Sequence, residues 1–336
     1  ILASDIAFHG KLIGSGSLTK DKESSFSFQK IDGVLNFEYN NFESVEKLIN
    51  EHKDNIYALI VEPYSASTLQ ELDTEFLLNV RAITKKYNIV LIYDEIYTGW
   101  AKVGNLMNFM RCCTNYESCS DDLKNCMCEN IAPDILTLSK TLGGGKSSIS
   151  SYVTRKEIYE KTYSSIQEFS LHSTTYSYFA EEAATALEAI NVIIEDRYVE
   201  KLQKVSKIFD DSFRKLQNKF PNKIVNIKGK GLIRGIEFNL SVLQSDSSKF
   251  GDVINKFKKR EFERLIIATY MAYLYDQHSI LVGIVDNEKP MIRVSPSNII
   301  KEEEILIFFN ALEDMLEKNT LNLILKFIKT YITNIF

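Results

Sequence analysis

The chain has 336 residues, of which 45% are hydrophobic and 25% are charged, a composition typical of a globular protein with a large core. Its formal net charge of -5 offers no basic face for a polyanion, which argues against binding to nucleic acid or to anionic membranes. Because the sequence contains no long apolar run and no secretory signal, we expect a cytosolic protein.

The first half of the chain predicts a β-α-β unit. Residues 56–61 are a short apolar run, typical of a buried strand. A helix is expected after Asp73, which suits an N-cap position. Its apolar face contains Phe76, Leu77, Val80 and Ile83. The continuous apolar run at residues 89–93 predicts a second buried strand, parallel to the first.

The middle of the chain predicts two more strands and a long helical region. The strands are expected at residues 135–138 and 149–153. Residues 180 to about 220 are mostly helix-forming. A tight packing face is expected there from Ala183, Ala184, Ala186 and Leu187.

After Pro221 the pattern changes to glycine-interrupted β-forming residues, followed by a charged helix. Further strands are predicted near residues 280–285 and 291–294, and a closing amphipathic helix at about 301–318. We therefore predict a large domain at residues 1–220 and a small α+β domain at residues 221–336.

The tail after residue 318 is apolar but contains Lys326 and Lys329. This pattern favours a packed or interface helix over a membrane anchor.

Two predicted strand ends carry residues suited to chemistry, and ligands bind at that edge of an open parallel sheet. One strand ends at Asp94 and Glu95, which point to opposite faces. Another ends at Lys140, shortly before the triple glycine 143–145. A desolvated lysine can attack an aldehyde, and a nearby carboxylate can bond to a protonated ring nitrogen. A nucleotide-binding loop is excluded because it needs a glycine where Lys140 stands.

The sequence resembles the class III aminotransferases of pyridoxal-phosphate (PLP) fold type I, near the acetylornithine and ornithine aminotransferases. The matching motifs occur in family order: Phe8-His9-Gly10, Glu62-Pro63, Asp94-Glu95 with Thr98-Gly99, Pro133-Asp134 through Lys140 to Gly145, His172 to Tyr176, Gly231-Leu232, and Ile292-Arg293. The resemblance implies a three-layer α/β/α large domain, a smaller α+β C-terminal domain, pyridoxal 5′-phosphate as cofactor, and ping-pong transamination between an amino donor and a carbonyl acceptor.

The resemblance also assigns roles to single residues. Lys140 would hold the cofactor as a Schiff base and move the substrate proton, rather than be a surface lysine. Asp94, rather than Glu95, would keep the pyridine nitrogen protonated. Phe8 would lie against the cofactor ring, with a core phenylalanine as the structural alternative.

The other cofactor-binding candidates are His9, Glu62, Tyr97 and Thr175. Thr175 would reach the cofactor phosphate from a neighbouring subunit, which implies a homodimer with shared active sites. Arg293 would grip a substrate carboxylate, with a structural salt bridge as the alternative. His9 and His172 have structural roles as their alternatives.

The sequence departs from its relatives at several points. Residues 64–68 replace a Gln-Gly-Glu-Gly stretch, so the acid that masks the carboxylate-binding arginine is absent. Tyr97 stands where many relatives have glutamine, and residues 177–180 replace Gly-Gly-Asn-Pro. The phosphate-binding loop of the family has no counterpart before Ile1, so either the chain is a fragment or the enzyme is incomplete as given.

The segment between the acid and lysine motifs is longer than usual and holds all the cysteines. They are Cys112, Cys113, Cys119, Cys126 and Cys128. We predict reduced thiols and no metal, with a zinc or iron-sulfur site as the alternative, because the spacing lacks paired C-x-x-C motifs.

Two other functions remain open at this point. One is an aminomutase of the glutamate-semialdehyde type, which needs no external keto acid. The other is a degenerate relative that serves as a binding partner without catalysis.

Overall fold

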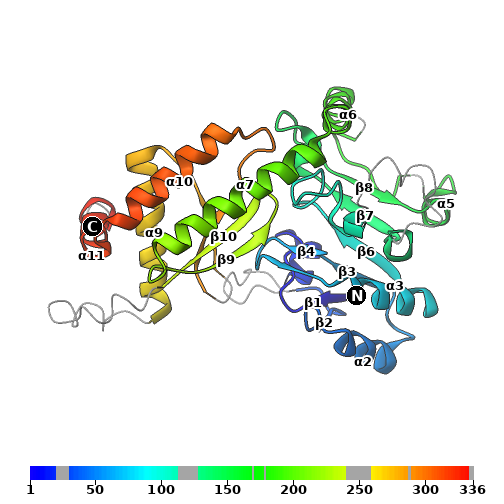
Figure 1. The fold of residues 1–336 in the computed structure, drawn as a ribbon. Helices are drawn as coiled ribbons and strands as arrows, with labels where there is room; N and C mark the ends of the chain where they lie inside the picture. Colours follow the sequence, from blue (N-terminus) through cyan, green and yellow to red (C-terminus); the bar gives the residue numbers. More distant parts are fainter. Residues whose placement is uncertain are drawn as a thin grey trace. The chain divides into compact units, whose positions relative to one another are not determined.

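The computed structural model describes residues 1–19, 30–112, 128–168, 170–177, 179–239, 259–286 and 289–332. The chain divides into two compact units, Ile1–Val199 and Glu200–Phe336. Figure 1 shows the elements of each unit. None of the helices in the described ranges is long and apolar enough to cross a membrane.

The first unit is built on a six-stranded sheet in the order β2-β1-β3-β6-β7-β8 (Figure 1). The first five strands in this order run parallel to one another. The sixth strand, β8, runs antiparallel to its neighbour β7. The strands are β1 (Leu2–Ser4), β2 (Leu35–Phe37), β3 (Ala58–Val61), β6 (Val90–Asp94), β7 (Ile135–Leu138) and β8 (Ser151–Thr154). The predicted strands and the parallel β-α-β unit are thereby confirmed.

One face of this sheet is covered by α2 (Phe42–His52) and α3 (Thr74–Lys86). The core there combines Leu59, Leu91 and Tyr93 of the strands with Ile49 and Leu77 of the helices. A smaller cluster on the other face contains Ala3, Ala7 and Ile60, with Ile92 packed against it. Alternate strand residues therefore serve opposite faces, as a pleated sheet requires.

Shorter elements connect the strands of this sheet. They are α1 (Ile13–Leu18), the hairpin β4 (Tyr64–Ser65) and β5 (Gln70–Glu71), and the 3-10 turns η1 (Asn108–Cys112), η3 (Glu129–Ile131) and η4 (Lys140–Gly143). Two helices, α5 (Lys156–Tyr163) and α6 (Ala180–Glu195), follow β8.

The predicted packing face of α6 is wrong in part. Only Ala186 of the four residues is buried, while Ala183, Ala184 and Leu187 are exposed. Ala186 and Ile193 instead face a core that contains Trp100 and Leu142. Local composition identified an apolar helix, but the position of its neighbours decided which side is covered.

The second unit contains a four-stranded antiparallel sheet in the order β11-β12-β10-β9. Its strands are β9 (Ile224–Lys230), β10 (Ile233–Phe238), β11 (Gly283–Val285) and β12 (Met291–Val294). Its helices are α7 (Tyr198–Lys219), α9 (Lys259–His278), α10 (Glu302–Glu317), α11 (Thr320–Phe327) and the π-helical η6 (Ile328–Ile332).

The unit boundary falls one helix earlier than the predicted division at residue 221. All but the first two residues of α7 belong to the second unit. The reason is a buried aromatic cluster, in which Phe209 and Phe213 of α7 contact Phe309 of α10. The centroids of the Phe213 and Phe309 rings lie 4.7 Å apart.

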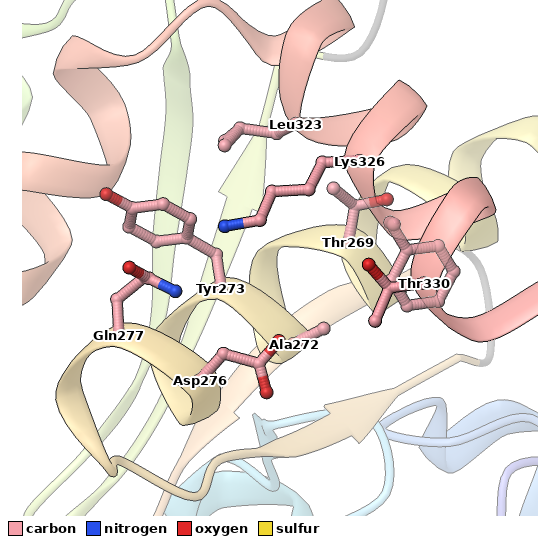
Figure 2. A pocket seen from close by; sticks show the side chains of 9 residues that line it. Thr269, Ala272, Tyr273, Asp276, Gln277, Leu323, Lys326 and Thr330 are labelled. Carbon is pink, nitrogen blue, oxygen red and sulfur yellow. The ribbon is translucent and has the colours of Figure 1, made fainter.

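The tail helix α11 packs on α9, where it buries Leu323 and Ile324. Figure 2 shows a small pocket between these helices, and Lys326 and Tyr273 line it from opposite sides. Another groove lies between α2 and α3 in the first unit. Neither of these two contains a predicted site residue.

Candidate active site

The register of two neighbouring strands brings the predicted acid and lysine to one edge of the sheet. Asp94 of β6 pairs with Thr137 of β7 in parallel. Lys140 follows Thr137 by three residues, as Tyr97 follows Asp94. The turns that carry Lys140 and Tyr97 therefore leave adjacent strands at the same level. This is the carboxyl edge, where open parallel sheets bind ligands.

Asp94 lies at the carboxyl edge, on a side of the sheet that its strand parity fixes. It has the parity of Ile92, opposite to the face covered by α2 and α3. Its carboxylate is 8% exposed. It accepts a hydrogen bond from the Ile96 N–H at 3.1 Å and lies 2.8 Å from His9 Nδ1. A buried histidine thus holds the carboxylate in place.

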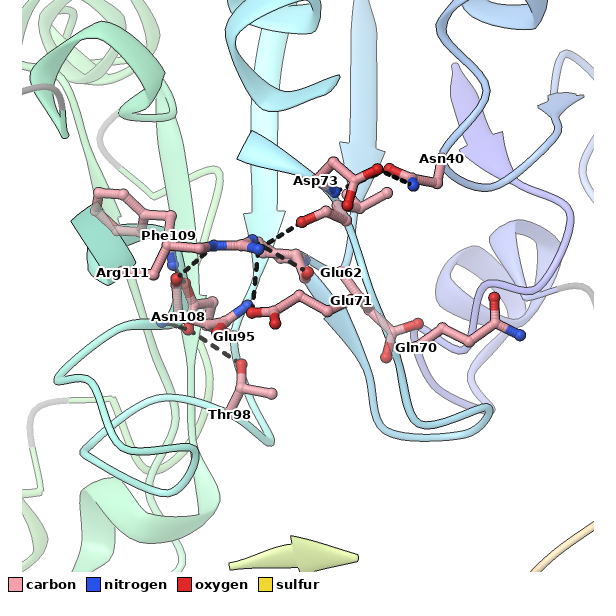
Figure 3. Close-up of polar contacts among 12 residues, drawn as sticks. Asn40, Glu62, Gln70, Glu71, Asp73, Glu95, Thr98, Asn108, Phe109 and Arg111 are labelled. Atoms are coloured by element: carbon pink, nitrogen blue, oxygen red, sulfur yellow. Dashed lines mark hydrogen bonds and ion pairs between the residues drawn. The ribbon is translucent and has the colours of Figure 1, made fainter. Parts of the chain in front are cut away.

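Glu95 has a different role, which sequence reasoning missed. Its buried carboxylate accepts hydrogen bonds from the Thr98 hydroxyl at 3.0 Å, the Asn108 N–H at 2.5 Å and the Phe109 N–H at 2.9 Å (Figure 3). Burial raises the pKa of Glu95, against the effect of these donors. Glu95 is fully buried and therefore organises the loop after β6.

A second buried acid, Glu62, lies at the end of the neighbouring strand β3. It accepts the Phe8 N–H at 3.0 Å. Burial raises the pKa of Glu62 to about 7, although the charge of His9 opposes the rise. For His9, burial opposes protonation, but the bond to Asp94 and the nearby negative charges outweigh it and raise its pKa. The predicted residues Phe8, His9, Glu62 and Asp94 thus form one connected group.

Lys140 begins η4 directly after β7, and its backbone is in the left-handed region with φ of +49°. A non-glycine residue there is strained by roughly 1–2 kcal/mol, so surrounding contacts must hold it. The Ser139 hydroxyl donates to the Ile149 carbonyl at 2.9 Å on one side. On the other side, Gly144 has φ of +60° and closely approaches Ala189 of α6. The Lys140 ammonium lies 4.6 Å from the centroid of the Tyr97 ring.

Arg111 joins two loops beside this group (Figure 3). Its guanidinium pairs with Glu71 at 3.0 Å and donates to the carbonyls of Leu72 and Pro63. A third donor, Nε, reaches the Asn108 carbonyl at 3.3 Å. Arg111 therefore ties η1 to the β4–β5 hairpin that follows Glu62. No sequence motif indicated this role, because its partners lie far apart in the chain.

Several predicted residues lie outside this group. Thr175 and His172 are exposed in the turn before α6, where the His172 ring packs edge-on against Tyr152. Arg293 lies on β12 in the second unit, and its Nε would be 3.2 Å from a Cβ placed on Gly283. Their predicted roles stay predictions.

The cysteine segment gives no metal centre within the described residues, which contain no group of three or more potential ligands. Cys128 is buried, and the backbone of Cys112 ends η1. Cys113, Cys119 and Cys126 lie outside the described ranges.

Known proteins resemble this chain in sequence and in fold. The family model Aminotransferase class-III matches residues 1–316. The chain is 25% identical over 312 residues to a mitochondrial ornithine aminotransferase of Oryza sativa subsp. japonica, a match that covers 92% of the chain and 57% of that protein. The chain thus spans little more than half the length of this curated relative.

Solved structures agree at the level of the fold. A transaminase from the marine bacterium Virgibacillus has a TM-score of 0.74 at 18% identity, over 94% of this chain and 68% of that one. The ornithine aminotransferase from Toxoplasma gondii ME49 has a TM-score of 0.68 at 20% identity, over 94% and 63%. The fold is thus the expected PLP fold type I, and the family model covers both units. The chain is a member of the class III aminotransferase family.

Proposed function

We propose that this protein is a PLP-dependent aminotransferase. The observation that carries the proposal is the juxtaposition at the carboxyl edge of the sheet. There, a lysine and a histidine-held carboxylate follow two paired strands, β7 and β6. Family membership of residues 1–316 supports the same reaction class.

The residues present fit the cofactor. Lys140 supplies an amine, and Asp94 supplies a carboxylate that a buried histidine orients. Phe8, which precedes His9 and whose N–H donates to Glu62, is 39% exposed, so it is not part of the core and can cover a flat ligand. His9 Nε2 is buried and has no hydrogen-bond partner among the described residues, a polar position suited to a ligand or water.

When bound, pyridoxal phosphate supplies an aldehyde that condenses with amines and a ring that accepts electrons. The protein supplies proton handling. The Lys140 Nζ would take a proton from the substrate carbon and deliver it to the aldehyde carbon of the cofactor, for which a flexible amine at a strand end is suited. Asp94 would hold a protonated ring nitrogen through its carboxylate, with His9 preserving its orientation.

The substrates would be an amino donor and a carbonyl acceptor that bind in turn. For Arg293 we propose binding of a substrate carboxylate, as the resemblance implies. Its guanidinium lies across Gly283, where the lack of a side chain leaves room for it. Support for ornithine as a substrate comes only from the names of relatives, so we leave the donor at the level of an amino acid or amine.

We further propose a homodimer in which Thr175 of one protomer completes the cofactor phosphate site of its partner. Thr175 is exposed, and exposed apolar side chains surround its segment. They are Leu171, Tyr176, Phe179 and Leu187. Apolar residues gathered in this way favour a protein interface.

Borohydride trapping tests the proposed activity. Purified protein loaded with pyridoxal phosphate should absorb in the near-visible, and reduction should leave the adduct on the Lys140 peptide in mass spectrometry. Lys140→Ala should lower transamination by at least about 100-fold, because the base at the substrate carbon is lost. The exposed neighbour Lys146 gives the matched control, since Lys146→Ala should keep full turnover.

Turnover should also require an external keto acid, which separates a transaminase from an aminomutase. An adduct on another lysine, or normal activity of Lys140→Ala, would overturn the proposal. A protein that takes up no cofactor would favour the non-catalytic binding partner.

A further inference from the structure

We propose that the face of the Tyr97 ring holds the Lys140 ammonium at the carboxyl edge of the sheet, which makes Tyr97 a positioning residue for this amine. The inference rests on the proposed role of Lys140 as the cofactor lysine. Its starting observation is the distance of 4.6 Å between Lys140 Nζ and the centroid of the Tyr97 ring. That distance lies within the range of cation–π attraction.

The strand register makes this contact a built feature. Both residues stand three positions after the paired residues Asp94 and Thr137. The β6–β7 pair therefore brings the two turns to neighbouring positions at the carboxyl edge. Ile92 and Ile135 continue the same register below them.

The turn that carries Tyr97 is held from both ends. The Ile96 N–H donates to Asp94 at 3.1 Å, and the Gly99 N–H donates to the Glu95 carbonyl at 2.9 Å. The Thr98 hydroxyl adds a bond to the Glu95 carboxylate at 3.0 Å. These bonds hold the backbone of the turn that carries the Tyr97 ring.

The neighbouring carboxylates already accept bonds from other donors. Asp94 is engaged by His9 and the Ile96 N–H, and Glu95 by Thr98 and two backbone N–H groups. An aromatic face attracts the ammonium without the strong charge pairing of a salt bridge. It can therefore orient the lysine and still release it as a neutral amine when an aldehyde arrives.

The ring and the hydroxyl can be separated by substitution. Tyr97→Phe keeps the aromatic face and removes the hydroxyl, whereas Tyr97→Leu removes the face. Loss of the face destabilises the ammonium, so a larger share of Lys140 is the reactive neutral amine at a given pH. We expect the acylation rate of Lys140 at pH 8 to rise about two- to fivefold in Tyr97→Leu, and to stay at the wild-type value in Tyr97→Phe.

The experiment uses cofactor-free full-length protein and a trace pulse of acetic anhydride, which acylates only neutral amines. Mass spectrometry gives the ratio of label on Lys140 to label on Lys146, an exposed lysine six residues away that serves as internal control. Circular dichroism checks the fold of each variant. If Tyr97→Leu does not fold, Tyr97→Met removes the face in its place.

An unchanged ratio in the ring-free variant would overturn the proposal. An equal rise in Tyr97→Phe would also overturn it, because the hydroxyl would then hold the amine. The proposed function can fail separately. If wild-type protein forms no borohydride-stable adduct while the ring-free variant still shows the rise, Tyr97 positions Lys140 but the lysine does not capture the cofactor.

Discussion

At the scale of single residues, the chain from Glu62 through His9 to Asp94 is the most unusual feature of the site. Two acids and one histidine are buried together, where unpaired charges are costly. The 2.8 Å bond between His9 and Asp94 favours a charged pair, and a proton on Glu62 removes the surplus negative charge. Below a pH of about 7, Glu62 is therefore a neutral neighbour that still accepts the Phe8 N–H.

This arrangement predicts a pH dependence of stability. The Glu62 pKa is raised from 4.5 to about 7 on folding, so the unfolded chain loses this proton first as the pH rises. Stability is therefore lost between about pH 4.5 and about pH 7. Glu62→Gln keeps the shape and the acceptor, and should be more stable than wild type at pH 8 by up to about 3 kcal/mol.

Urea unfolding from pH 5 to 8.5 checks this, followed by the fluorescence of Trp100, the single tryptophan, which is buried in the first unit. Glu46→Gln, an identical change on the exposed side of α2, should leave the pH profile of wild type unchanged. Parallel profiles for wild type and Glu62→Gln would contradict the raised pKa.

At the scale of elements, Arg111 links η1 to the β4–β5 hairpin. Its side chain is 13% exposed and its partner Glu71 is 29% exposed. The hairpin occupies the segment in which this sequence departs from its relatives, directly after Glu62-Pro63. Arg111 therefore connects η1, whose first residue Asn108 is held by Glu95, with the β4–β5 hairpin that follows Glu62 (Figure 3).

Arg111→Met should lower the free energy of unfolding by about 2–4 kcal/mol, because three carbonyls lose a donor and Glu71 loses its ion pair with Arg111. Arg155→Met is the matched control. Arg155 pairs with Asp134, but its side chain is 43% exposed, so its loss should cost less than about 1 kcal/mol. If urea unfolding shows that the two variants lose the same free energy of unfolding, the Arg111 contacts stabilise the fold no more than the exposed Arg155 pair does.

At the scale of the whole molecule, the region from β8 to α6 exposes several large apolar side chains. Strand β8 is exposed at Ser151, Tyr152 and Val153, although the sheet is otherwise largely buried. On α6, Ala186 and Ile193 face the core, while Leu187 and Ile194 are 60% and 50% exposed on another side. A helix with two apolar sides normally has two partners.

We expect Leu187→Glu to convert the proposed dimer to a monomer, because a buried unpaired carboxylate at the interface is strongly unfavourable. Light scattering coupled to size-exclusion chromatography measures the mass. Leu281→Glu makes the same change at a residue that is 84% exposed in the second unit, and should leave the mass unchanged. A wild-type monomer, or a dimer that survives Leu187→Glu, would contradict an interface at α6.

The linear pattern alone was enough for the strands at residues 135–138 and 291–294 and for the closing helix at 301–318. It also led to the family, through motifs around Asp94 and Lys140. These are local properties, since apolar runs, helical periodicity and consecutive motif residues are all read over short stretches of chain. The family model and the parallel β3–β6 pair confirm them.

Tertiary structure decided the rest, because it depends on register and on contacts between distant residues. Strand parity puts Asp94 and Glu95 in different surroundings, the β6–β7 register brings Tyr97 close to Lys140, and three separate segments assemble Glu62, His9 and Asp94. Likewise, the sequence of a helix does not indicate which of the two units the helix belongs to. The aromatic cluster around Phe309 assigns α7 to the second unit, since burial is a property of the neighbours that a face meets.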